Sequence, residues 1–303
     1  MQTTLKAKRF TFAQIVKLSP VFASKLLFWK TFKHSLNLGN PQTFSEKLMW
    51  LKLFEDVEFK VRFTDKVKMR EYMIALGYSH LLVPIIGIFE EIEDIIFEQL
   101  PRKFVIKCTH GSGFTIVCEN KRELDYQKTR LQLAEMMATN YALINAEPHY
   151  LKIKPRIIIE KYIEPSRSDI SNAYKIHCFH GEPKIIELAL KRNTRNEQSV
   201  MLTPDWEDTG YIEKKLPYEI SESKPKQLED LLAIAKKLSK PFTYVRVDLN
   251  IVDEKIYFNK LSFTPDACLN IQIHEQANRE LGQLLELNIG KRKQPISIAR
   301  SKS

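Results

Sequence analysis

The chain has 303 residues, of which 44% are hydrophobic and 28% are charged, a composition typical of a globular protein of about two domains and not of a fibrous or disordered one. No apolar run is long enough to cross a membrane and the N-terminal residues lack a secretory leader pattern, so we expect a cytoplasmic protein. The net charge of +10 does not indicate nucleic-acid binding, because residues 1–45 and 291–303 hold twelve unopposed positive charges and residues 46–290 therefore carry −2.

The four cysteines lie far apart in the sequence, at Cys108, Cys118, Cys178 and Cys268. They lack the paired spacing of a zinc site or a redox motif. Three of them fall in apolar runs, so we expect buried free thiols and a reducing compartment.

The first 40 residues form a basic segment without an acidic residue. Its apolar spacing predicts an amphipathic helix over Phe12–Phe32 that is broken, or begins anew, near Pro20. In the simpler interpretation this helix packs on the core and its lysines are solvated. In the other, the lysines attract an anionic membrane surface while apolar residues enter it, namely Phe22, Leu26, Leu27, Phe28 and Trp29.

Helical signals continue over the next segment. Thr43 and Glu46 have the spacing of a capping box and predict a helix that begins there and runs through Phe54. A second helix is predicted over Lys60–Leu76. It should end at Gly77, because glycine readily adopts the left-handed conformation that closes helices.

Short β-like runs follow these helices. They predict strands over Leu82–Phe89, Lys103–Cys108 and Phe114–Cys118, and a glycine-containing loop, His110–Gly113, joins the last two. The next element is a helix predicted over Glu123–Ile144.

The middle of the chain is richer in strands. Apolar runs predict strands over Arg156–Ile163, Ala173–Phe179 and Lys184–Lys191, with a turn at His180–Pro183 between the last two. The polar stretch Asn193–Tyr218 is predicted to be an irregular, mobile loop.

The C-terminal part begins with a helix predicted over Pro225–Ser239. A hairpin should follow, with strands Tyr244–Asn250 and Lys255–Phe263 joined at Asp253-Glu254. The basic tail, residues 291–303, is predicted to be disordered. Helices mixed with antiparallel hairpins, without regular βαβ alternation, indicate an α+β fold and not a Rossmann sheet.

Two of the nine glycines in the chain flank Ser112 in the loop after Lys107. Glycines let main-chain N–H groups approach an anion closely, and a nearby lysine adds a charge suited to phosphate, so the loop is a candidate phosphate-binding loop. A plain hairpin turn is the alternative. A Walker A loop is excluded. In that motif Lys-Ser/Thr and a helix follow the second glycine, whereas here Phe114-Thr115 and a predicted strand follow Gly113.

Alternation along the first strand of the C-terminal hairpin places Arg246, Asp248 and Asn250 on one face. A carboxylate such as Asp248 is a natural Mg²⁺ ligand and an arginine stabilises a transferring phosphoryl group, whereas a surface ion pair is the alternative. His177 and His180 lie on opposite faces of a predicted strand, so we assign neither as a metal ligand.

Five motifs stand in a fixed order along the chain: Asn40-Pro41-x-Thr43-Phe44-x-Glu46-Lys47, Asp65-Lys66-x-x-x-Arg70-Glu71-Tyr72, Lys107-x-x-His110-Gly111-Ser112-Gly113, Pro155-Arg156-Ile157-Ile158-Ile159-Glu160-x-Tyr162 and Val245-Arg246-Val247-Asp248-Leu249. Together they resemble the TupA-like ATP-grasp family. Tyr174-Lys175, the turn Phe179-x-Gly181-x-Pro183-Lys184 and Phe263-Thr264-Pro265 fit the same pattern, so the likeness runs from about residue 40 to residue 287.

The resemblance implies the ATP-grasp fold, in which two α+β subdomains with mainly antiparallel sheets clasp ATP and Mg²⁺. It implies catalytic roles for Lys175, Arg246 and Asp248, with Asp248 as the metal ligand. Lys107 and Lys175 would contact the phosphates, and Glu160–Tyr162 would form the adenine hinge. The full expected nucleotide-binding set is Lys66, Lys107, His110, Gly111, Ser112, Gly113, Glu160, Lys161, Tyr162, Lys175 and Lys260, of which Lys161 and Lys260 are residues of this chain that differ from the family's pattern.

The charge distribution and the resemblance together divide the chain into five expected parts. We expect an N-terminal helical segment (1–40), a second helical region (41–100), the small ATP-grasp subdomain with the glycine loop (101–165), the large subdomain (166–290) and the basic tail (291–303). The first and last of these parts are the two basic segments.

One position departs from the family's pattern. Lys260 stands where the family usually has a glutamate that binds magnesium, so the local charge is inverted. Either this lysine neutralises phosphate itself and fewer metal ions are needed, or the protein no longer transfers phosphate. Lys161 also replaces a usual acid, and Asp266-Ala267-Cys268 replaces small residues.

The resemblance implies an ATP-dependent ligase of bacterial surface-polysaccharide biosynthesis, making capsule, lipopolysaccharide or a teichuronopeptide-like polymer. Such an enzyme activates a carboxylate as an acyl phosphate and joins it to an amine. The expected partners are a uronic-acid glycan or its lipid-linked precursor and an amino acid or amine, without nucleic acid. A degenerate protein that binds nucleotide or glycan without turnover is one alternative. A glycosyltransferase of the same pathway is another, although the sequence has no convincing Asp-x-Asp motif.

Overall fold

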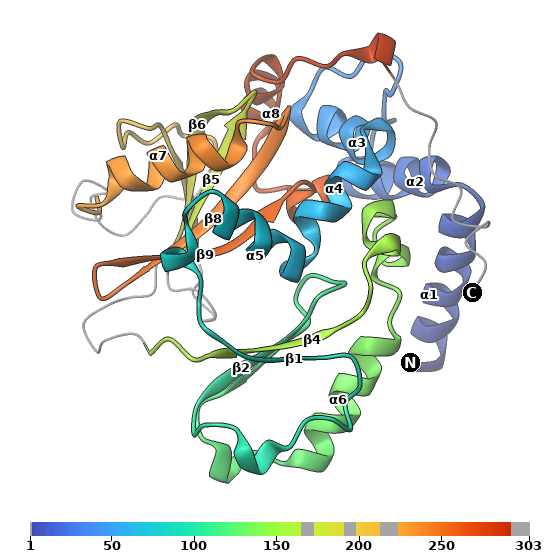
Figure 1. The fold of residues 1–303 in the computed structure, drawn as a ribbon. Coiled ribbons are helices and arrows are strands. Elements are labelled where there is room, and N and C mark those ends of the chain that lie inside the picture. The colour runs from blue at the N-terminus through green and yellow to red at the C-terminus, as the bar shows by residue number, and fades with distance from the viewer. Residues whose placement is uncertain (1, 165–172, 191–197, 213–223, 292–303) are drawn as a thin grey trace. The chain divides into compact units, whose positions relative to one another are not determined.

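The computed structural model describes residues 2–164, 173–190, 198–212 and 224–291. They form two compact units: the first contains the described residues of Met1–Leu18 and Val57–Glu164, and the second those of Ser19–Asp56 and Pro165–Ser297. Each unit combines helices with an antiparallel sheet, which confirms the α+β prediction (Figure 1). The finer domain boundaries expected from the sequence stay a prediction.

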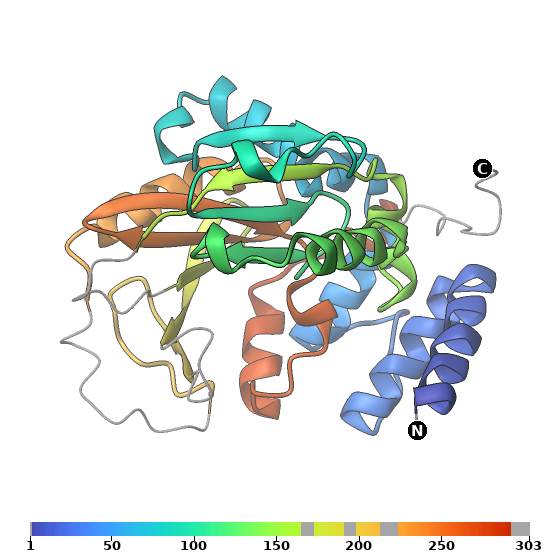
Figure 2. The ribbon, with the colours of Figure 1, turned by 90° about the horizontal axis from the view of Figure 1, so that it is seen from below.

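A four-stranded antiparallel sheet with the strand order β1-β4-β2-β3 is the basis of the first unit. The unit's main elements are α1 (Gln2–Leu18), α4 (Val57–Thr64), α5 (Lys66–Ala75), β1 (Ile85–Phe89), β2 (Phe104–Cys108), β3 (Thr115–Cys118), α6 (Tyr126–Ala138) and β4 (Ile157–Lys161). Helix α6 lies beneath the sheet in Figure 1 and in front of it in Figure 2. Phe104, Ile106 and Ile159 of the strands form a buried core with Leu133 of α6.

The helix predicted over Lys60–Leu76 is two helices, α4 and α5, so the prediction of one helix was wrong. Asp65 separates them: its side chain accepts hydrogen bonds from the main-chain N–H groups of Val67 (2.8 Å) and Lys68 (3.4 Å) and so caps α5. The sequence alone did not reveal this break, because an aspartate that caps a new helix looks the same in a sequence as a polar residue inside one longer helix. The predicted end at Gly77 is confirmed, with φ +82°.

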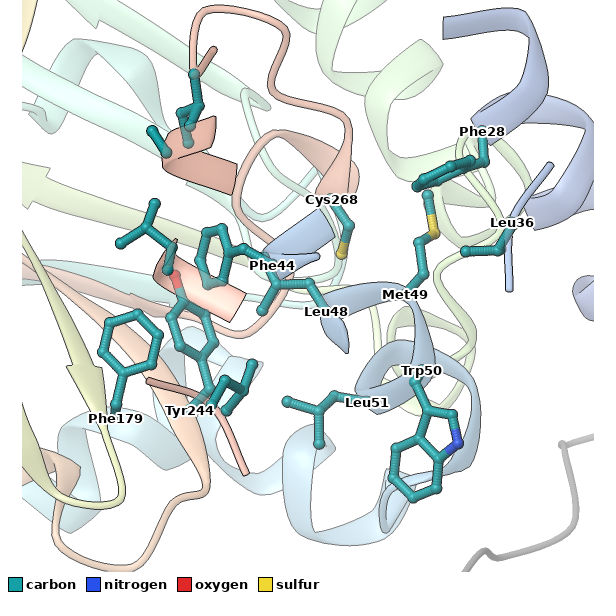
Figure 3. Packing of buried hydrophobic residues seen from close by; sticks show 14 of the residues in the cluster. Phe28, Leu36, Phe44, Leu48, Met49, Trp50, Leu51, Phe179, Tyr244 and Cys268 are labelled. Atoms are coloured by element: carbon teal, nitrogen blue, oxygen red, sulfur yellow. The ribbon is translucent and has the colours of Figure 1, made fainter. Parts of the chain in front are cut away.

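In the second unit, the sheet has five antiparallel strands in the order β7-β6-β5-β8-β9. The unit's main elements are α2 (Pro20–Phe32), α3 (Phe44–Phe54), β5 (Ala173–Phe179), β6 (Glu182–Leu190), β7 (Gln198–Leu202), α7 (Leu228–Ser239), β8 (Tyr244–Val252), β9 (Lys255–Ser262) and α8 (Glu275–Gln283). Helix α7 packs on one face, where Leu231, Ala235 and Leu238 are fully buried. On the other face Phe44 of α3 packs against Phe179 and Tyr244 (Figure 3).

Two helix starts in the second unit confirm the sequence prediction. The Ser19 hydroxyl accepts a hydrogen bond from the main-chain N–H of Phe22 (3.1 Å) and Pro20 occupies the first turn of α2, so the N-terminal helical segment is broken there. Thr43 and Glu46 form the predicted capping box at α3, with hydrogen bonds of 3.3 and 3.1 Å.

The stretch Asn193–Tyr218 was predicted to be an irregular loop, and within the described residues this is wrong at β7, which pairs with β6. Residues 193–197 and 213–218 lie outside the described residues. So does almost all of the predicted tail. The β8–β9 hairpin is confirmed: Asp253 (φ +50°) and Glu254 (φ +62°) form a two-residue turn whose twist matches the strands. No helix among the described residues is both long and apolar enough to span a bilayer.

Candidate functional site

Four charged residues form a line across the sheet of the second unit. Glu187 on β6 pairs with Lys175 on β5, which pairs with Asp248 on β8, which in turn pairs with Lys260 on β9. Cross-strand partners point to the same side of a sheet, so these side chains share the face opposite α7. We call Glu187, Lys175, Asp248 and Lys260 the polar row.

Ion pairs connect the polar row to Arg246, which lies two residues before Asp248. The Arg246 guanidinium donates to both oxygens of Asp248, from Nε at 2.8 Å and Nη2 at 3.0 Å, and both side chains are almost fully buried. Lys260 Nζ lies 3.9 Å from Asp248 Oδ2. Lys175 Nζ donates to Glu187 Oε1 at 2.6 Å. Three cations from neighbouring strands therefore meet on one face of the sheet.

Glu187 holds the centre of this network, and the sequence analysis did not identify it. Its carboxylate is 4% exposed and accepts from Lys175, from His177 Nε2 at 3.3 Å and from Arg246 Nη1 at 3.5 Å. Burial alone would raise the pKa of Glu187, but the His177 hydrogen bond and the Arg246 and Lys175 charges lower it well below its usual range. The available signal was a single acid inside the apolar run Ile185–Leu190.

Arg246 is held permanently charged by its neighbours. Burial alone would lower the pKa of the guanidinium, but the carboxylates of Asp248 and Glu187 raise it above its usual value. His177 is fixed from the other side by Tyr244, whose hydroxyl lies 2.8 Å from Nδ1. Burial raises the pKa of the Tyr244 hydroxyl well above its usual value, so this group stays neutral.

The segment after β9 brings a further carboxylate towards Arg246. Asp266 Oδ2 lies 4.0 Å from Arg246 Nη1, and the Asp266 side chain is half exposed. Asp266, Ala267 and Cys268 all have positive φ values, of 49°, 55° and 67°. Residues other than glycine are strained in this conformation, which gives a physical reason for the small residues that the family commonly has here.

Relief of this strain gives a stability prediction. We expect Ala267→Gly to raise the free energy of unfolding by about 1 kcal/mol, because glycine adopts φ +55° without the clash of a Cβ atom. Urea denaturation of the two proteins measures the difference. Ala277→Gly, at a buried position inside helix α8, is the control and should lower stability instead. An Ala267→Gly protein less stable than the parent would contradict the prediction.

In the first unit, a second charged group lies on the sheet face opposite α6. Lys107 Nζ on β2 donates to Glu160 Oε2 on β4 at 2.6 Å, and Arg70 Nη1 donates to Glu160 Oε1 at 3.1 Å. Glu160 is buried, whereas about a fifth of the Lys107 side chain is exposed (22%). The ammonium of Lys107 is therefore reachable from solvent beside the glycine loop.

Lys66 binds the glycine loop itself. Its ammonium donates to the main-chain carbonyls of Cys108 and Gly111, both at 2.8 Å, and so connects the end of β2 to the loop. Its predicted contact with a nucleotide is untested. The contacts that the structure gives make it a support for the loop that was expected to close over phosphate.

The two loop glycines are required for different reasons. Gly113 has φ +78°, which favours glycine. A Cβ atom at Gly111 would lie 2.6 Å from the ring of Phe114 and 3.0 Å from that of Tyr141, so a larger residue would displace these rings. Burial raises the pKa of Tyr141 to about 12, and Ser112 hydrogen-bonds to its side chain.

His110, predicted to bind nucleotide, is almost fully buried and lies 3.1 Å, through Nε2, from the carbonyl of Met136 in α6. Burial lowers the pKa of His110, so the neutral ring donates this hydrogen bond and anchors the loop to α6.

At the far end of β4, Lys161 is exposed and Tyr162 donates to Glu119 Oε1 at 3.3 Å. Glu119 and Lys103 border an open depression of about 540 Å³.

We expect Lys66→Met to release the glycine loop. The change removes two charge-assisted hydrogen bonds, each with a net value of about 1.5–3 kcal/mol, so the loop amides of residues 109–113 should exchange with solvent faster. ATP binding should weaken about tenfold if the loop covers phosphate. Hydrogen exchange and calorimetry measure the two effects. Lys68→Met, an exposed lysine of the same helix, is the control, and equal exchange in both variants would contradict the assignment.

The predicted site residues thus fall into two groups. Lys175, Arg246, Asp248 and Lys260 meet in the second unit, whereas Lys66, Lys107, His110, the loop residues and Glu160 lie together in the first. His177 and His180 do not meet: His180 Nε2 accepts from the main-chain N–H of Glu286 at 3.0 Å. Across the described ranges, no three His, Cys, Asp or Glu side chains are arranged to hold a metal by themselves.

Solved structures similar to this chain include ligases of low sequence identity. D-Alanine-D-alanine ligase from Helicobacter pylori has 15% identity and a TM-score of 0.42, with 80% of this chain and 69% of that chain covered. The Bacillus anthracis enzyme complexed with ATP has 18% identity and a TM-score of 0.38, with 73% and 63% covered. ATP-grasp ligase PsnB complexed with a minimal precursor has 12% identity and a TM-score of 0.39, with 82% and 67% covered.

The family comparison covers most of the sequence. No curated protein sequence matches the chain. The TupA-like ATPgrasp family matches over residues 46–286, which include both units' charged groups and the glycine loop. ATP-grasp proteins are typically ATP-dependent ligases, and the fold implies ATP binding. The chain belongs to the TupA-like ATP-grasp family.

Proposed function

We propose that this protein is an ATP-dependent carboxylate–amine ligase that works through an acyl phosphate. The observation that carries the proposal is the convergence of Lys175, Arg246 and Lys260 around Asp248 on one face of the second sheet. Three buried or half-buried cations on a rigid sheet suit the stabilisation of charge on a transferring phosphoryl group.

The nucleotide side of the proposal rests on the first unit. Lys107 and the main-chain N–H groups of the glycine loop would contact the phosphates, since a solvent-reachable ammonium stands near Gly113, whose exposed backbone has open space on the side where a Cβ atom would be. Lys66 would hold the loop, and Glu160–Tyr162 would bind the adenine edge. The hinge role of these last residues follows from the family pattern and from their position at the end of a buried strand.

The residues around Asp248 fit one magnesium ion that arrives with the nucleotide. Asp248 offers a carboxylate, and Asn250 Oδ1 on the same face is a buried oxygen with no hydrogen-bond partner among the described residues. Mg²⁺ is commonly held by one or two carboxylates together with phosphate oxygens. When bound, the ion would neutralise part of the negative charge on the phosphates.

The proposed reaction has two steps. A carboxylate oxygen of the substrate attacks the γ-phosphorus of ATP and ADP leaves, which gives an acyl phosphate. The amine nitrogen then attacks the acyl carbon, the carbon–oxygen bond to phosphate breaks, and inorganic phosphate and a proton leave as the amide forms. Arg246 and Lys175 would stabilise the negative charge in both steps, and Glu187 would keep them in place.

The substrates are proposed from the family alone. A uronic-acid glycan, or its lipid-linked precursor, would provide the carboxylate, and an amino acid or another amine would provide the nitrogen in surface-polysaccharide biosynthesis. Because ATP is the cosubstrate, we place the reaction in the cytoplasm.

Oxygen transfer tests the acyl phosphate. With a carboxylate labelled with ¹⁸O, one labelled oxygen should appear in inorganic phosphate, and the release of inorganic phosphate should require both the carboxylate and the amine. Lys175→Met should abolish the transfer, and Lys184→Met, an exposed lysine of β6, is the matched control. Hydrolysis of ATP without label in phosphate would contradict the mechanism.

A degenerate nucleotide-binding protein is the second candidate, and Lys260 favours it. The ammonium of Lys260 lies 3.9 Å from Asp248, at the position where the family usually has a magnesium-binding acid. This candidate predicts calorimetric ATP binding without ADP formation across a panel of uronic acids and amines.

A further inference from the structure

Helix α2 has an exposed apolar stripe. Phe22, Leu26 and Trp29 follow one another at intervals of four and three residues, so they lie on one side of the helix. Their side chains are 58%, 38% and 55% exposed. We call these three residues the α2 stripe. They include the only phenylalanine and the only tryptophan among the exposed large hydrophobic residues described in the second unit.

The opposite side of α2 is already buried in its own unit. Pro20, Ala23 and Phe28 are covered, and the Phe28 ring lies 4.6 Å from that of Phe32 and 5.2 Å from that of His34. Figure 3 shows Phe28 pointing towards Met49 and Leu36 of the core. This packing fixes the rotation of the helix, so the α2 stripe is held outward and is not an unpacked part of the core.

Lysines surround the α2 stripe. Lys25 and Lys30 are exposed and, by helical spacing, flank the stripe on either side, and Lys33 is exposed directly after the last turn of the helix. Residues 1–45 contain no acidic residue, whereas residues 46–290 carry a net charge of −2. Within the second unit, residues 19–45 therefore carry three positive charges, Lys25, Lys30 and Lys33, and no negative one.

We propose that α2 lies in the interface of an anionic lipid bilayer, with the α2 stripe among the headgroups and acyl-chain ends. Aromatic and aliphatic side chains in a row enter this layer, and the flanking lysines attract acidic headgroups while their stems lie along the apolar surface. An acidic glycan would be bound through many hydrogen bonds, whereas the α2 stripe offers a single donor, the indole N–H of Trp29. The proposal does not depend on the ligase activity.

Vesicle binding by the full chain tests the proposal, and Trp29 is a built-in reporter. Trp50 and Trp206 are buried, so a blue shift of tryptophan emission on adding vesicles should report Trp29. We expect co-sedimentation and a blue shift with phosphatidylcholine vesicles that contain about one third phosphatidylglycerol, and little of either with phosphatidylcholine alone. A protein that fails to bind the anionic vesicles overturns the proposal.

Two double variants separate the apolar and the electrostatic contribution. Phe22→Ser/Leu26→Ser keeps Trp29 and should lose the blue shift, and Lys25→Glu/Lys30→Glu should weaken binding at least about thirtyfold. Lys184→Glu/Lys255→Glu, at exposed positions outside α2, is the charge-matched control and should bind like the parent.

Three results would overturn the proposal. An equal loss in the control would show general electrostatic attraction. Binding of a soluble acidic polysaccharide with the same Trp29 shift, but not of vesicles, would assign the surface to a glycan. A dimer in light scattering that Phe22→Ser/Leu26→Ser disperses would make a second copy of the chain the occupant. A negative result would leave the ligase proposal intact, because the oxygen-transfer assay needs no membrane.

Discussion

Glu187→Gln is expected to lower the free energy of unfolding by about 3 kcal/mol, because it removes the charge that three buried or half-buried groups share. Lys175 would lose its 2.6 Å partner, and the buried Arg246 would keep Asp248 and, at 4.0 Å, the half-exposed Asp266. Glutamine has nearly the same size, so packing is conserved and the charge is the main change. Urea denaturation at pH 7 measures the effect.

Glu182→Gln is the matched control, since it makes the same substitution on the same strand. The Glu182 carboxylate lies 2.9 Å from Lys236 Nζ, but both side chains are about half exposed. Exposed ion pairs contribute only about 0–1 kcal/mol, so the control should stay close to the parent. Similar stabilities for the two variants would show that the Glu187 network contributes little to the fold.

The stability difference between the parent and Glu187→Gln should depend on pH. Because the pKa of Glu187 in the folded protein is well below the ordinary value of 4.5, unfolding below that pH takes up a proton. The contribution of this carboxylate is therefore fully present above pH 4.5 and decreases as the pH falls through the acid range. Denaturation curves at pH 7 and at about pH 3 should show a smaller difference at the lower pH. An unchanged difference would show that Glu187 has an ordinary pKa.

Local signals predicted most of the elements correctly. The capping box at Thr43 and Glu46, the break at Pro20 and the hairpin turn at Asp253-Glu254 depend on residues a few positions apart, and the structure has all of them. Alternation along β8 also placed Arg246 and Asp248 on one face, as observed.

What the sequence did not predict depends on contacts between distant segments. Glu187 acts because β6 is a neighbour of β5, and that in turn depends on the order of the five strands. The sequence around Glu187 shows an acid inside an apolar run and no cation that could pair with it, because Lys175 and Arg246 lie 12 and 59 positions away. The motif that contains Lys66 led to the prediction that this lysine binds the nucleotide. Its hydrogen bonds to the carbonyls of Cys108 and Gly111 could not be predicted, because they depend on how the loop folds back onto α5.

Lys260→Glu decides between the active and the degenerate protein, and we expect it to weaken ATP binding about 10- to 100-fold. The substitution reverses one charge about 4 Å from a charged partner at a partly exposed site, and the electrostatic interaction between two such groups changes by roughly this amount. The Lys260 side chain is 38% exposed and its ammonium is 3.9 Å from Asp248. In the proposed site, the ammonium of Lys260 neutralises part of the phosphate charge that a metal ion would otherwise neutralise. The substitution removes this positive charge and also places a second carboxylate beside that of Asp248. Calorimetric titration with ATP at low and high Mg²⁺ measures the change.

Lys255→Glu is the control, because it reverses a charge on the same strand at the exposed end of the hairpin. It should leave ATP binding unchanged. In Lys260→Glu the paired carboxylates should favour an additional Mg²⁺, so the affinity for ATP should recover at high Mg²⁺ more than in the parent. ADP release measured with the same substrates gives the decisive comparison. A parent without ADP release and a Lys260→Glu protein with it would contradict the ligase proposal, since the natural lysine would then be what prevents turnover.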